Sequence, residues 1–360
     1  MLFRSAHSLL TPLQNPWTYA HERNGFSRCT DHAFFGPQNR SCNITSGNGL
    51  WGTYILSGNS TAADGNAGDY HLRRNGFVVG YEKAAKGGHS YLGAMFSYNQ
   101  AKLDAFRSGV NTNDFQIGLY HGKRAWDRWE WKNFLGMGVQ DYNMHRNIDI
   151  NLSHSEWKDS TGATCWTDGV TGNMLSNFLG LTFAGSTELA RPFYFGKCCQ
   201  WTVRPYMGFD IMAVWQNKAS EYADFDDDVF WVDSQEYGDQ FHASKLVALD
   251  YHSATNVRVY GRPGITLERG GSNGNIRMGV AYSYLMGGHR YTNVTNQFQF
   301  DGDKFNIRGV DDGSGFVTAN VGAGVYLGKR KLSMVYLDYA VMAGSHSTTH
   351  AGQLGYQKNF

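Results

Sequence analysis

Most of this chain alternates apolar and polar residues over long segments, and this period of two constrains the fold more than any other feature. In 315–328, one face carries Val321 and Val325, and the other carries Asn320 and Gly322. Successive side chains of a β-strand point to opposite faces of its sheet, whereas a helix would repeat about every 3.6 residues. The pattern therefore predicts an all-β protein built from long strands.

The alternation divides the chain into twelve expected strands. They span 50–57, 70–84, 89–103, 112–124, 127–143, 173–189, 199–216, 255–268, 274–287, 313–328, 331–343 and 347–360. Several exceed the ~5–6 residues of an ordinary strand and suffice for the ~9–11 residues of a tilted membrane crossing. Three connections are long (144–172, 217–254 and 288–312) and alternate with tight turns. This layout, with an even strand number, predicts a closed antiparallel up-and-down transmembrane β-barrel.

The two faces of these strands differ in chemistry. The face expected to meet lipid is apolar and carries rings suited to the membrane interfaces: Trp131, Trp201, Trp215, Tyr282 and Tyr284. The opposite face mixes small residues with charges, which would cost ~2–4 kcal/mol each near the middle of the lipid. We therefore expect a polar lumen lined by Lys132, Arg204, Asp210, Arg258, Arg262, Glu268, Arg277 and Asp338. The alternative is a soluble β-sandwich, in which the same alternation separates core from solvent.

Charge and cysteine content exclude several classes of protein. Lys and Arg total 32 against 31 Asp and Glu, a formal charge of +1, so nucleic acid is not an expected partner. No run approaches the ~18–20 apolar residues of a membrane helix. The five cysteines show no zinc-ligand spacing, and we expect no metal or other cofactor. Cys29 and Cys42 flank a Gly/Pro/Asn-rich segment and could close a disulfide, or both could stay free thiols.

No catalytic motif stands out. His346 and His350 lack a third metal ligand, and the acidic run at 224–228 does not follow the ligand order of an EF-hand. The chain has no GxSxG motif, and its Ser, His and Asp residues are scattered. We therefore expect a protein that is not an enzyme. A hydrolase with such residues gathered at the barrel rim is the least favoured alternative.

Residues 50–360 resemble the autotransporter β-domain, the translocator barrel of type V secretion. The segments that carry the resemblance are GLWGTYILSGNSTAADGNAGDY, NGFVVGYEKA, SYLGAMFSYNQAKLDA, NDFQIGLYHGKRAWDRWEWKNFLGMG, VRPYMGFDIMAVWQ, NVRVYGRPGITLER and LSMVYLDYAVMAGSHSTTHAGQLGYQKNF. The resemblance implies a twelve-stranded barrel in the bacterial outer membrane. It also implies an N-terminal passenger that the barrel carries to the cell surface, and a helix inside the pore.

The first 49 residues would then form a separate segment. Residues 1–14 could supply a short pore helix, limited by Pro12 and Pro16. Irregular loop would follow to residue 49, as a remnant of the passenger. The chain starts with a single Arg and a broken apolar stretch, which is not typical of a signal peptide. We expect the C-terminal part of a longer exported product, or a barrel that has lost its cargo.

The C-terminus resembles the signal that the outer-membrane barrel assembly machinery recognises. Leu354, Tyr356 and the terminal Phe360 share one face of the last expected strand, with Gly355 on the other. Lys358 departs from the pattern, because related barrels often carry an apolar residue there, although a lysine can extend its amine to the interface.

The combined prediction is a monomeric outer-membrane translocator barrel whose partners are the surrounding lipid, the assembly machinery and its own passenger. A passive pore or an adhesin with its function in the long loops is the alternative. A helix inside the lumen would favour the translocator, and an open lumen would favour the pore.

Overall fold

The computed structural model describes residues 49–64, 68–84, 90–124, 129–150, 155–158, 164–167, 170–195, 201–224, 229–230, 241–242, 247–271, 273–291, 293–299, 302–309, 313–328 and 333–360. The predicted pore helix at 1–14 and the cysteines at positions 29 and 42 lie outside these ranges. None of the helical segments in the described ranges is long and apolar enough to cross a membrane.

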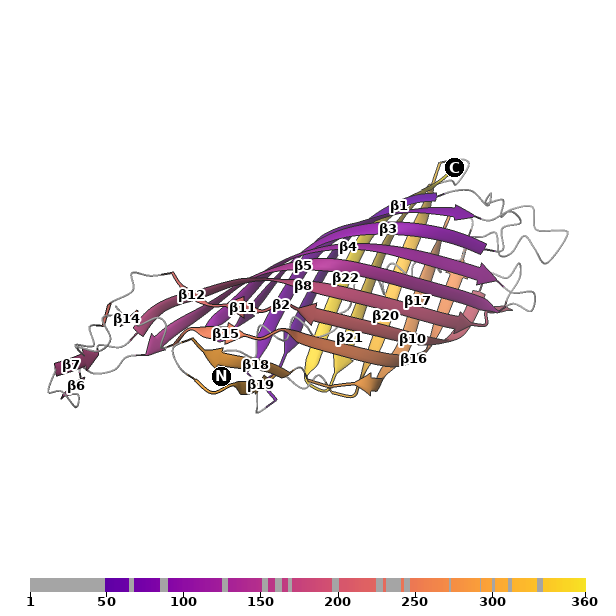
Figure 1. Cartoon of the computed structure of the whole chain (residues 1–360). Coiled ribbons are helices and arrows are strands. Elements are labelled where there is room, and N and C mark those ends of the chain that lie inside the picture. Colours follow the sequence, from indigo (N-terminus) through magenta and orange to yellow (C-terminus); the bar gives the residue numbers. More distant parts are fainter. Residues whose placement is uncertain are drawn as a thin grey trace.

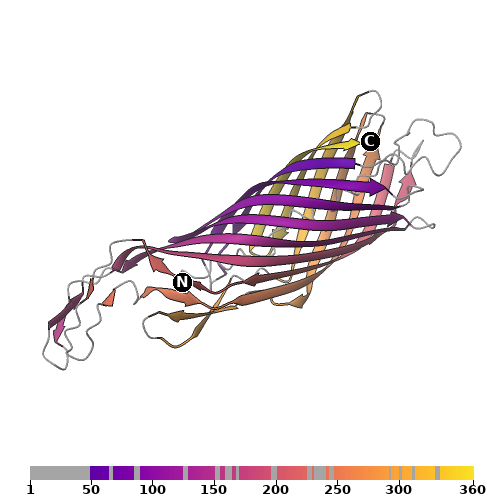
Figure 2. The same ribbon diagram turned by 45° about the horizontal axis from the view of Figure 1, so that its top comes forward.

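Twelve long antiparallel strands form a closed barrel, as predicted. They are β1 (Gly49–Thr61), β2 (Tyr70–Ala84), β3 (Ser90–Ala105), β4 (Ser108–Arg124), β5 (Glu130–Ile150), β8 (Val170–Ala190), β10 (Trp201–Gln216), β16 (Ala254–Gly270), β17 (Gly274–Gly288), β20 (Gly315–Leu327), β21 (Ser333–Gly344) and β22 (Ser347–Asn359). Each strand pairs with its neighbours in sequence, and β1 also pairs with β22. The first and last strands therefore meet, and the wall has no free edge (Figures 1 and 2).

The barrel wall is longer on one side than the sequence pattern predicted. β5 and β8 have 21 residues each, against predicted spans of 127–143 and 173–189, and β4 begins at Ser108 instead of residue 112. The added residues carry polar outward side chains, such as Asn147 and Asp149. The outward positions are no longer apolar there. A prediction based on hydrophobic alternation therefore ends each strand at the level where it leaves the lipid. This wall extension prolongs one side of the barrel (Figure 2).

The long connections contain further strands, which the sequence did not predict. Within 217–254 and 288–312, β11 (Ala219–Ser220), β15 (Leu249–Tyr251), β18 (Asn293–Phe298) and β19 (Phe305–Arg308) form a second sheet in that order. Shorter strands are β6 (Ser155–Lys158), β7 (Thr164–Thr167), β9 (Phe193–Phe195), β12 (Tyr222–Ala223), β13 (Val229–Phe230) and β14 (Phe241–His242). The prediction of plain loops was therefore wrong here. Strands of two to six residues are too short to show a clear period.

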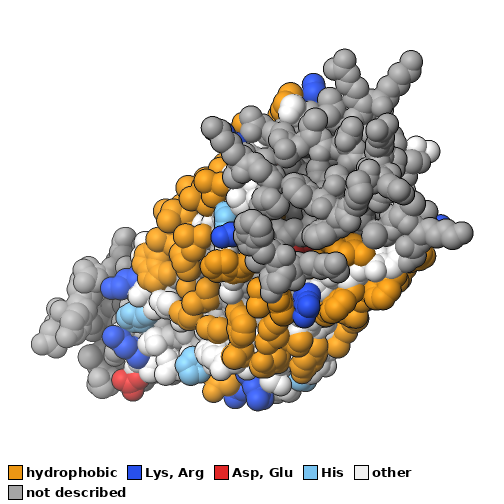
Figure 3. All heavy atoms as spheres, turned by 90° about the vertical axis from the view of Figure 1, so that its right-hand side faces the viewer, with side chains coloured by type: hydrophobic (Ala, Val, Ile, Leu, Met, Phe, Trp, Pro, Cys, Tyr) orange, Lys and Arg blue, Asp and Glu red, His pale blue; other side chains and the backbone are white. Residues whose placement is uncertain are grey.

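An apolar belt surrounds the outer wall. Its exposed side chains include Leu135 and Met137 on β5, Leu181 on β8, Val280 on β17 and Leu337 on β21. Of the predicted interface rings, Trp131, Trp201, Trp215 and Tyr282 are exposed, and Tyr284 is half-buried. Figure 3 shows hydrophobic side chains covering the visible wall. A soluble sandwich would bury these residues, whereas a membrane barrel presents them to lipid.

A tyrosine reinforces the closing seam of the barrel from inside. Tyr336 on β21 crosses over Gly355 on β22, and its hydroxyl donates to the carbonyl of Gly52 on β1 at 3.1 Å. A Cβ atom at position 355 would collide with the Tyr336 ring. The missing side chain of Gly355 thus allows one residue to link three adjacent strands across the point where the chain ends meet.

Candidate functional site

The inward face of the barrel is the candidate site, because it combines charges from many strands. The eight charged residues expected to line the lumen all occupy positions that alternate with the exposed apolar belt. They are Lys132 on β5, Arg204 and Asp210 on β10, Arg258, Arg262 and Glu268 on β16, Arg277 on β17, and Asp338 on β21. The structure pairs four of them with one another, Arg262 with Asp210 and Arg277 with Asp338, and the other four contact residues that were not predicted.

The largest group surrounds Glu188 on β8, whose side chain is 2% exposed. Lys132 Nζ lies 3.8 Å and Arg262 Nη1 lies 3.5 Å from its carboxylate, and Arg204 donates to it directly. Arg204 also donates to Glu130 at 2.8 Å. We call these residues, together with Asp210, the Glu188 cluster.

Asp210 completes this group. Arg262 Nε donates to Asp210 at 2.9 Å, and the Ser186 hydroxyl donates to it at 2.5 Å. The Arg262 side chain reaches both carboxylates by passing over Gly208. A Cβ atom at position 208 would lie only 3.1 Å from the Arg262 guanidinium. Tyr206 lies between the two arginines, with its ring 5.5 Å from the Arg204 guanidinium and 5.4 Å from that of Arg262.

The Glu188 cluster is electrically balanced. Three cations (Lys132, Arg204, Arg262) face three carboxylates (Glu130, Glu188, Asp210) on β5, β8, β10 and β16. Removing one member of a buried pair costs ~3–5 kcal/mol, because a charge stays behind without its counter-ion. The cluster therefore fixes four neighbouring strands and fills this side of the lumen with mutually compensated charge.

Sequence reasoning missed Glu188 and Glu130, although it identified their partners. A signal was available, since Glu188 is the one carboxylate on the inward face of the 173–189 segment, where its neighbours are small or apolar. A charge at an inward position of a membrane strand needs a partner or water. That rule would have added Glu188 to the expected lining.

Smaller contacts involve the other predicted residues on β16, β17 and β21. Arg277 Nη2 lies 3.4 Å from Asp338, and Gln353 Nε2 donates to the same carboxylate at 3.3 Å. Glu268 accepts from Asn275 at 3.2 Å. Arg258 Nη2 donates to the carbonyl of Arg290 at 3.1 Å.

A second polar centre lies beyond the apolar belt, inside the wall extension. Arg146 is seven residues past Val139, the last belt residue of β5, which is about 23 Å along the strand. Its Nε donates to Glu221 at 2.9 Å, and its Nη2 donates to the carbonyl of Val247 at 2.8 Å. Both charged side chains are buried, with 7% and 0% exposure.

The Glu221 carboxylate connects the wall to the second sheet. It accepts from the Leu249 amide at 3.1 Å and from the Tyr251 hydroxyl at 2.6 Å, both on β15. Burial raises the pKa of the Tyr251 hydroxyl well above its ordinary value, and the nearby Glu221 charge raises it further. The phenol therefore stays protonated and remains a donor at neutral pH.

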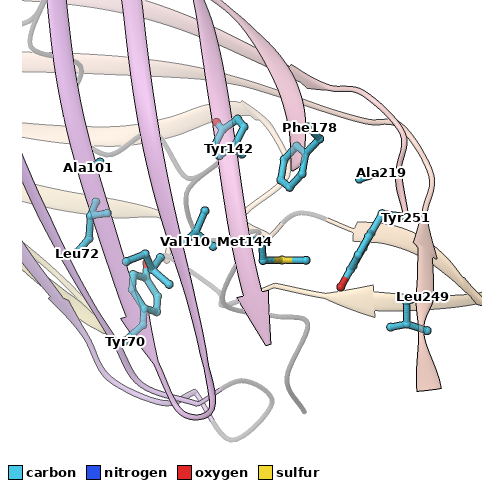
Figure 4. Packing of buried hydrophobic residues seen from close by; sticks show 11 residues of the cluster. Tyr70, Leu72, Ala101, Val110, Tyr142, Met144, Phe178, Ala219, Leu249 and Tyr251 are labelled. Atoms are coloured by element: carbon cyan, nitrogen blue, oxygen red, sulfur yellow. The ribbon is translucent and has the colours of Figure 1, made fainter. Parts of the chain in front are cut away.

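Apolar packing surrounds this anchor. Inward residues of β2, β3, β4, β5 and β8 share one buried cluster with residues of the second sheet: Tyr70, Leu72, Ala101, Leu103, Val110, Tyr142, Met144, Phe178, Ala219, Leu249 and Tyr251 (Figure 4). Tyr142 and Phe178 stack with their ring centroids 4.8 Å apart. The sheet β11–β15–β18–β19, which we call the cap, thus covers the inner side of the wall at the end that carries the long loops.

The C-terminal residues lie as the last strand of a barrel requires. Leu354, Tyr356 and Phe360 are exposed on the outer face, and Gly355 faces inward beneath Tyr336. Lys358 shares the outer face, and its Nζ lies 5.3 Å from the centroid of the Phe360 ring. A cation over an aromatic ring is attractive, so the lysine is accommodated next to the terminal residue.

Among the residues that the structure describes, no three His, Cys, Asp or Glu side chains are placed so that they could hold a metal ion. His350 lies on the outer face with its Nδ1 2.7 Å from the Tyr339 hydroxyl, and His346 contacts Ser345. The rest of the acidic run, 225–228, lies outside the described ranges.

These observations define an outer-membrane β-barrel with a charged lumen, an outer apolar belt and a cap over one end. The sequence matches the autotransporter β-domain over residues 50–238. The chain therefore belongs to the autotransporter β-domain family, as its sequence segments indicated. Its place is the bacterial outer membrane, and it is a translocator barrel, a class of protein that anchors and exports rather than catalyses.

Solved structures with a similar fold include two autotransporter barrels. The translocator domain of NalP from Neisseria meningitidis has 12% identity and a TM-score of 0.61, covering 97% of this chain and 100% of that one. The β-domain of the Bordetella autotransporter BrkA has 17% identity and a TM-score of 0.51, covering 87% and 100%. A deletion mutant of the Pseudomonas putida channel TodX has 9% identity and a TM-score of 0.51, covering 88% and 91%. No curated protein sequence matches.

Proposed function

We propose that the lumen of this barrel is the route by which the segment N-terminal to β1 reaches the cell surface. The observation that carries the proposal is the place where β1 begins. Gly49 pairs with Asn359 of the last strand and with Glu82 near the end of β2. β1 therefore starts at the end with the short turns, which in bacterial barrels faces the periplasm. A segment attached to that end can reach the exterior only through the lumen.

In this proposal residues 1–49 form the exported or displayed segment and residues 50–360 form the translocator. The inward residues of the Glu188 cluster, together with Arg258, Glu268, Arg277 and Asp338, line the route. Because their charges compensate one another, the lumen stays polar without a strong net field that would hold a passing chain of either sign. The lining has no catalytic role.

The partners of the barrel follow from its outer surface. We infer that Leu354, Tyr356 and Phe360, exposed together on β22, present the signal that the barrel assembly machinery binds. The apolar belt contacts lipid around the wall, and the barrel works as a monomer. If the cysteines at positions 29 and 42 form a disulfide, it lies in the exported segment.

The experiment that tests the proposal places an epitope before residue 1 and measures its accessibility in intact cells. An epitope between Ser345 and His346, at the long-loop end, is the external control, and one in the 271–273 turn is the internal control. We expect the N-terminal epitope to be cleaved by added protease in intact cells, like the external control. Cleavage only after permeabilisation, like the internal control, would refute export of this segment.

A passive pore is the competing function. The cap argues against it, because β15 packs on the inner side of the wall at the end with the long loops and β18 pairs with β15. Conductance in a planar bilayer separates the two functions. A translocator closed by its cap and its lumen charges should show a small conductance, and a stable conductance of the size found for general porins would favour the pore.

A further inference from the structure

A groove of about 860 Å³ crosses the outer face of β21, β22, β1, β2, β3 and β4. Its floor contains two glycines, Gly58 on β1 and Gly352 on β22. A Cβ atom built on either would meet nothing within 4 Å. Gly58 pairs with Arg73 on one side and His350 on the other, so larger side chains flank the floor. The groove is therefore an open depression whose depth comes from missing side chains.

The groove lies where the apolar belt ends. On the lipid side it is lined by Leu56 and Tyr339, which are 54% and 45% exposed. On the side of the long loops its outward lining is polar, with Arg73 on β2, Lys102 on β3 and Asn111 on β4. This change from apolar to polar lining marks the level at which lipid tails give way to headgroups at the extracellular surface.

Two cations face the groove side by side, because Arg73 and Lys102 are directly paired across β2 and β3. Lys102 Nζ also lies 3.1 Å from Asp104, and both side chains of that pair are about half exposed. Within the described ranges, no carboxylate pairs with Arg73. Asn75, Gln100 and Asn113 supply amide donors and acceptors next to these charges. Cations flanked by amides suit a phosphorylated saccharide, which offers anionic oxygens and hydroxyl groups together.

We propose that this groove binds the phosphorylated saccharide headgroup of a glycolipid of the outer leaflet, lipopolysaccharide. Arg73 and Lys102 contact the phosphate, the neighbouring amides contact sugar hydroxyls, and the acyl chains lie along Leu56 and Tyr339. Continuity with the apolar belt supports this occupant, because the lower wall of the groove already contacts lipid. The inference depends on the membrane placement and not on whether the lumen exports a passenger.

The test titrates the full-length barrel, folded in detergent micelles, with lipopolysaccharide and counts bound molecules by native mass spectrometry. The variant Gly58→Trp fills the groove, and the double variant Arg73→Ala/Lys102→Ala removes its cations. Gly270→Trp is the matched control for the tryptophan, since Gly270 also has open space around its Cβ position but lies at the short-turn end of β16. Lys304→Ala, an exposed cation before β19, is the control for charge.

We expect retention of lipopolysaccharide by the wild type and both controls, and its loss in Gly58→Trp. Exposed ion pairs are worth ~0.2–1 kcal/mol, so the double variant should bind up to about fivefold more weakly for each cation lost, with the difference shrinking at high salt. Equal retention by Gly58→Trp and Gly270→Trp would overturn the proposal. So would equally tight binding of dephosphorylated lipopolysaccharide, or a dimeric wild type that Gly58→Trp converts to monomer. Unchanged migration of unboiled samples shows that each variant has folded.

Discussion

The contact between the cap and the wall yields the sharpest prediction, for the substitution Glu221→Gln. The two oxygens of Glu221 accept four hydrogen bonds: two from Arg146, one from the Leu249 amide and one from the Tyr251 hydroxyl. Glutamine has the same shape but keeps only one accepting oxygen and no charge. Each oxygen accepts from Arg146 and from one β15 donor, so either amide orientation breaks one bond of each kind.

The expected cost follows from burial. Arg146 and Glu221 are 7% and 0% exposed, and breaking such a buried pair costs ~3–5 kcal/mol. The exposed pair formed by Arg107 and Asp149 offers a matched comparison on the same wall extension. Its atoms are 3.3 Å apart at 42% and 50% exposure, so Asp149→Asn should cost at most ~1 kcal/mol. The two substitutions remove the same charge at different depths.

Hydrogen exchange of the folded barrel measures this difference as local opening of the cap. Because ~1.4 kcal/mol is a tenfold change in an equilibrium, the β15 and β18 amides should exchange at least about a hundredfold faster in Glu221→Gln. In Asp149→Asn the same amides should change by about fivefold or less. Equal exchange in both variants would refute the reasoning, because it would show that the cap does not depend on the buried pair. Unboiled samples that still migrate as folded barrels exclude general unfolding.

Three further predictions concern the seam, the cap and the belt. Gly355→Val should block folding into a heat-modifiable barrel, because its side chain would occupy the place of the Tyr336 ring, and normal migration of unboiled samples would contradict this. Because the pKa of the Tyr251 hydroxyl is raised in the folded barrel, the stability that this hydroxyl gives the cap is fully present below the ordinary pKa of 10 and declines above it. After correction for intrinsic rates, the cap amides should therefore exchange faster at pH 11 than at pH 9. Tyr251→Phe should lack this added pH dependence, and an identical profile would count against the assignment. Leu181→Arg in the belt should lower the free energy of unfolding by ~2–4 kcal/mol, and Thr182→Arg on the inward face should lower it less. Urea unfolding in vesicles measures both, and equal losses would contradict the membrane placement of β8.

The barrel was predictable because each strand that crosses the membrane keeps apolar residues on its lipid face and polar or small residues on its inward face along its whole length. In β20, Val317, Val321 and Val325 are all exposed, and their spacing alone placed that strand. The same rule placed Lys132 and Arg204 on the inward side. The strand ends were harder to predict, since Asp149 and Thr171, which are paired in register on β5 and β8, are equally compatible with a loop.

The cap could not be predicted, because it depends on contacts between distant segments. Glu221 lies 75 residues from Arg146 and 30 from Tyr251, and no local pattern links the three. β11 and β15 contribute only two and three residues each. Their stability comes from packing against inward residues of the wall, of which only Val110 and Met144 lie outside the predicted strands. The wall that supports the second sheet was therefore largely predicted, and the short strands that pack on it were not.

The two polar centres of the barrel differ in what a passing chain would have to disturb. The Glu188 cluster joins strands that are already neighbours in the wall, so its pairs do not depend on the position of any loop. The Arg146–Glu221 pair instead joins the wall to a loop-borne sheet that lies over the inner side of the lumen's outer end. Passage at that end requires the cap to move, and its movement breaks the buried pair. The cap anchor, rather than the lumen charges, is therefore the contact whose strength sets how readily the extracellular end opens.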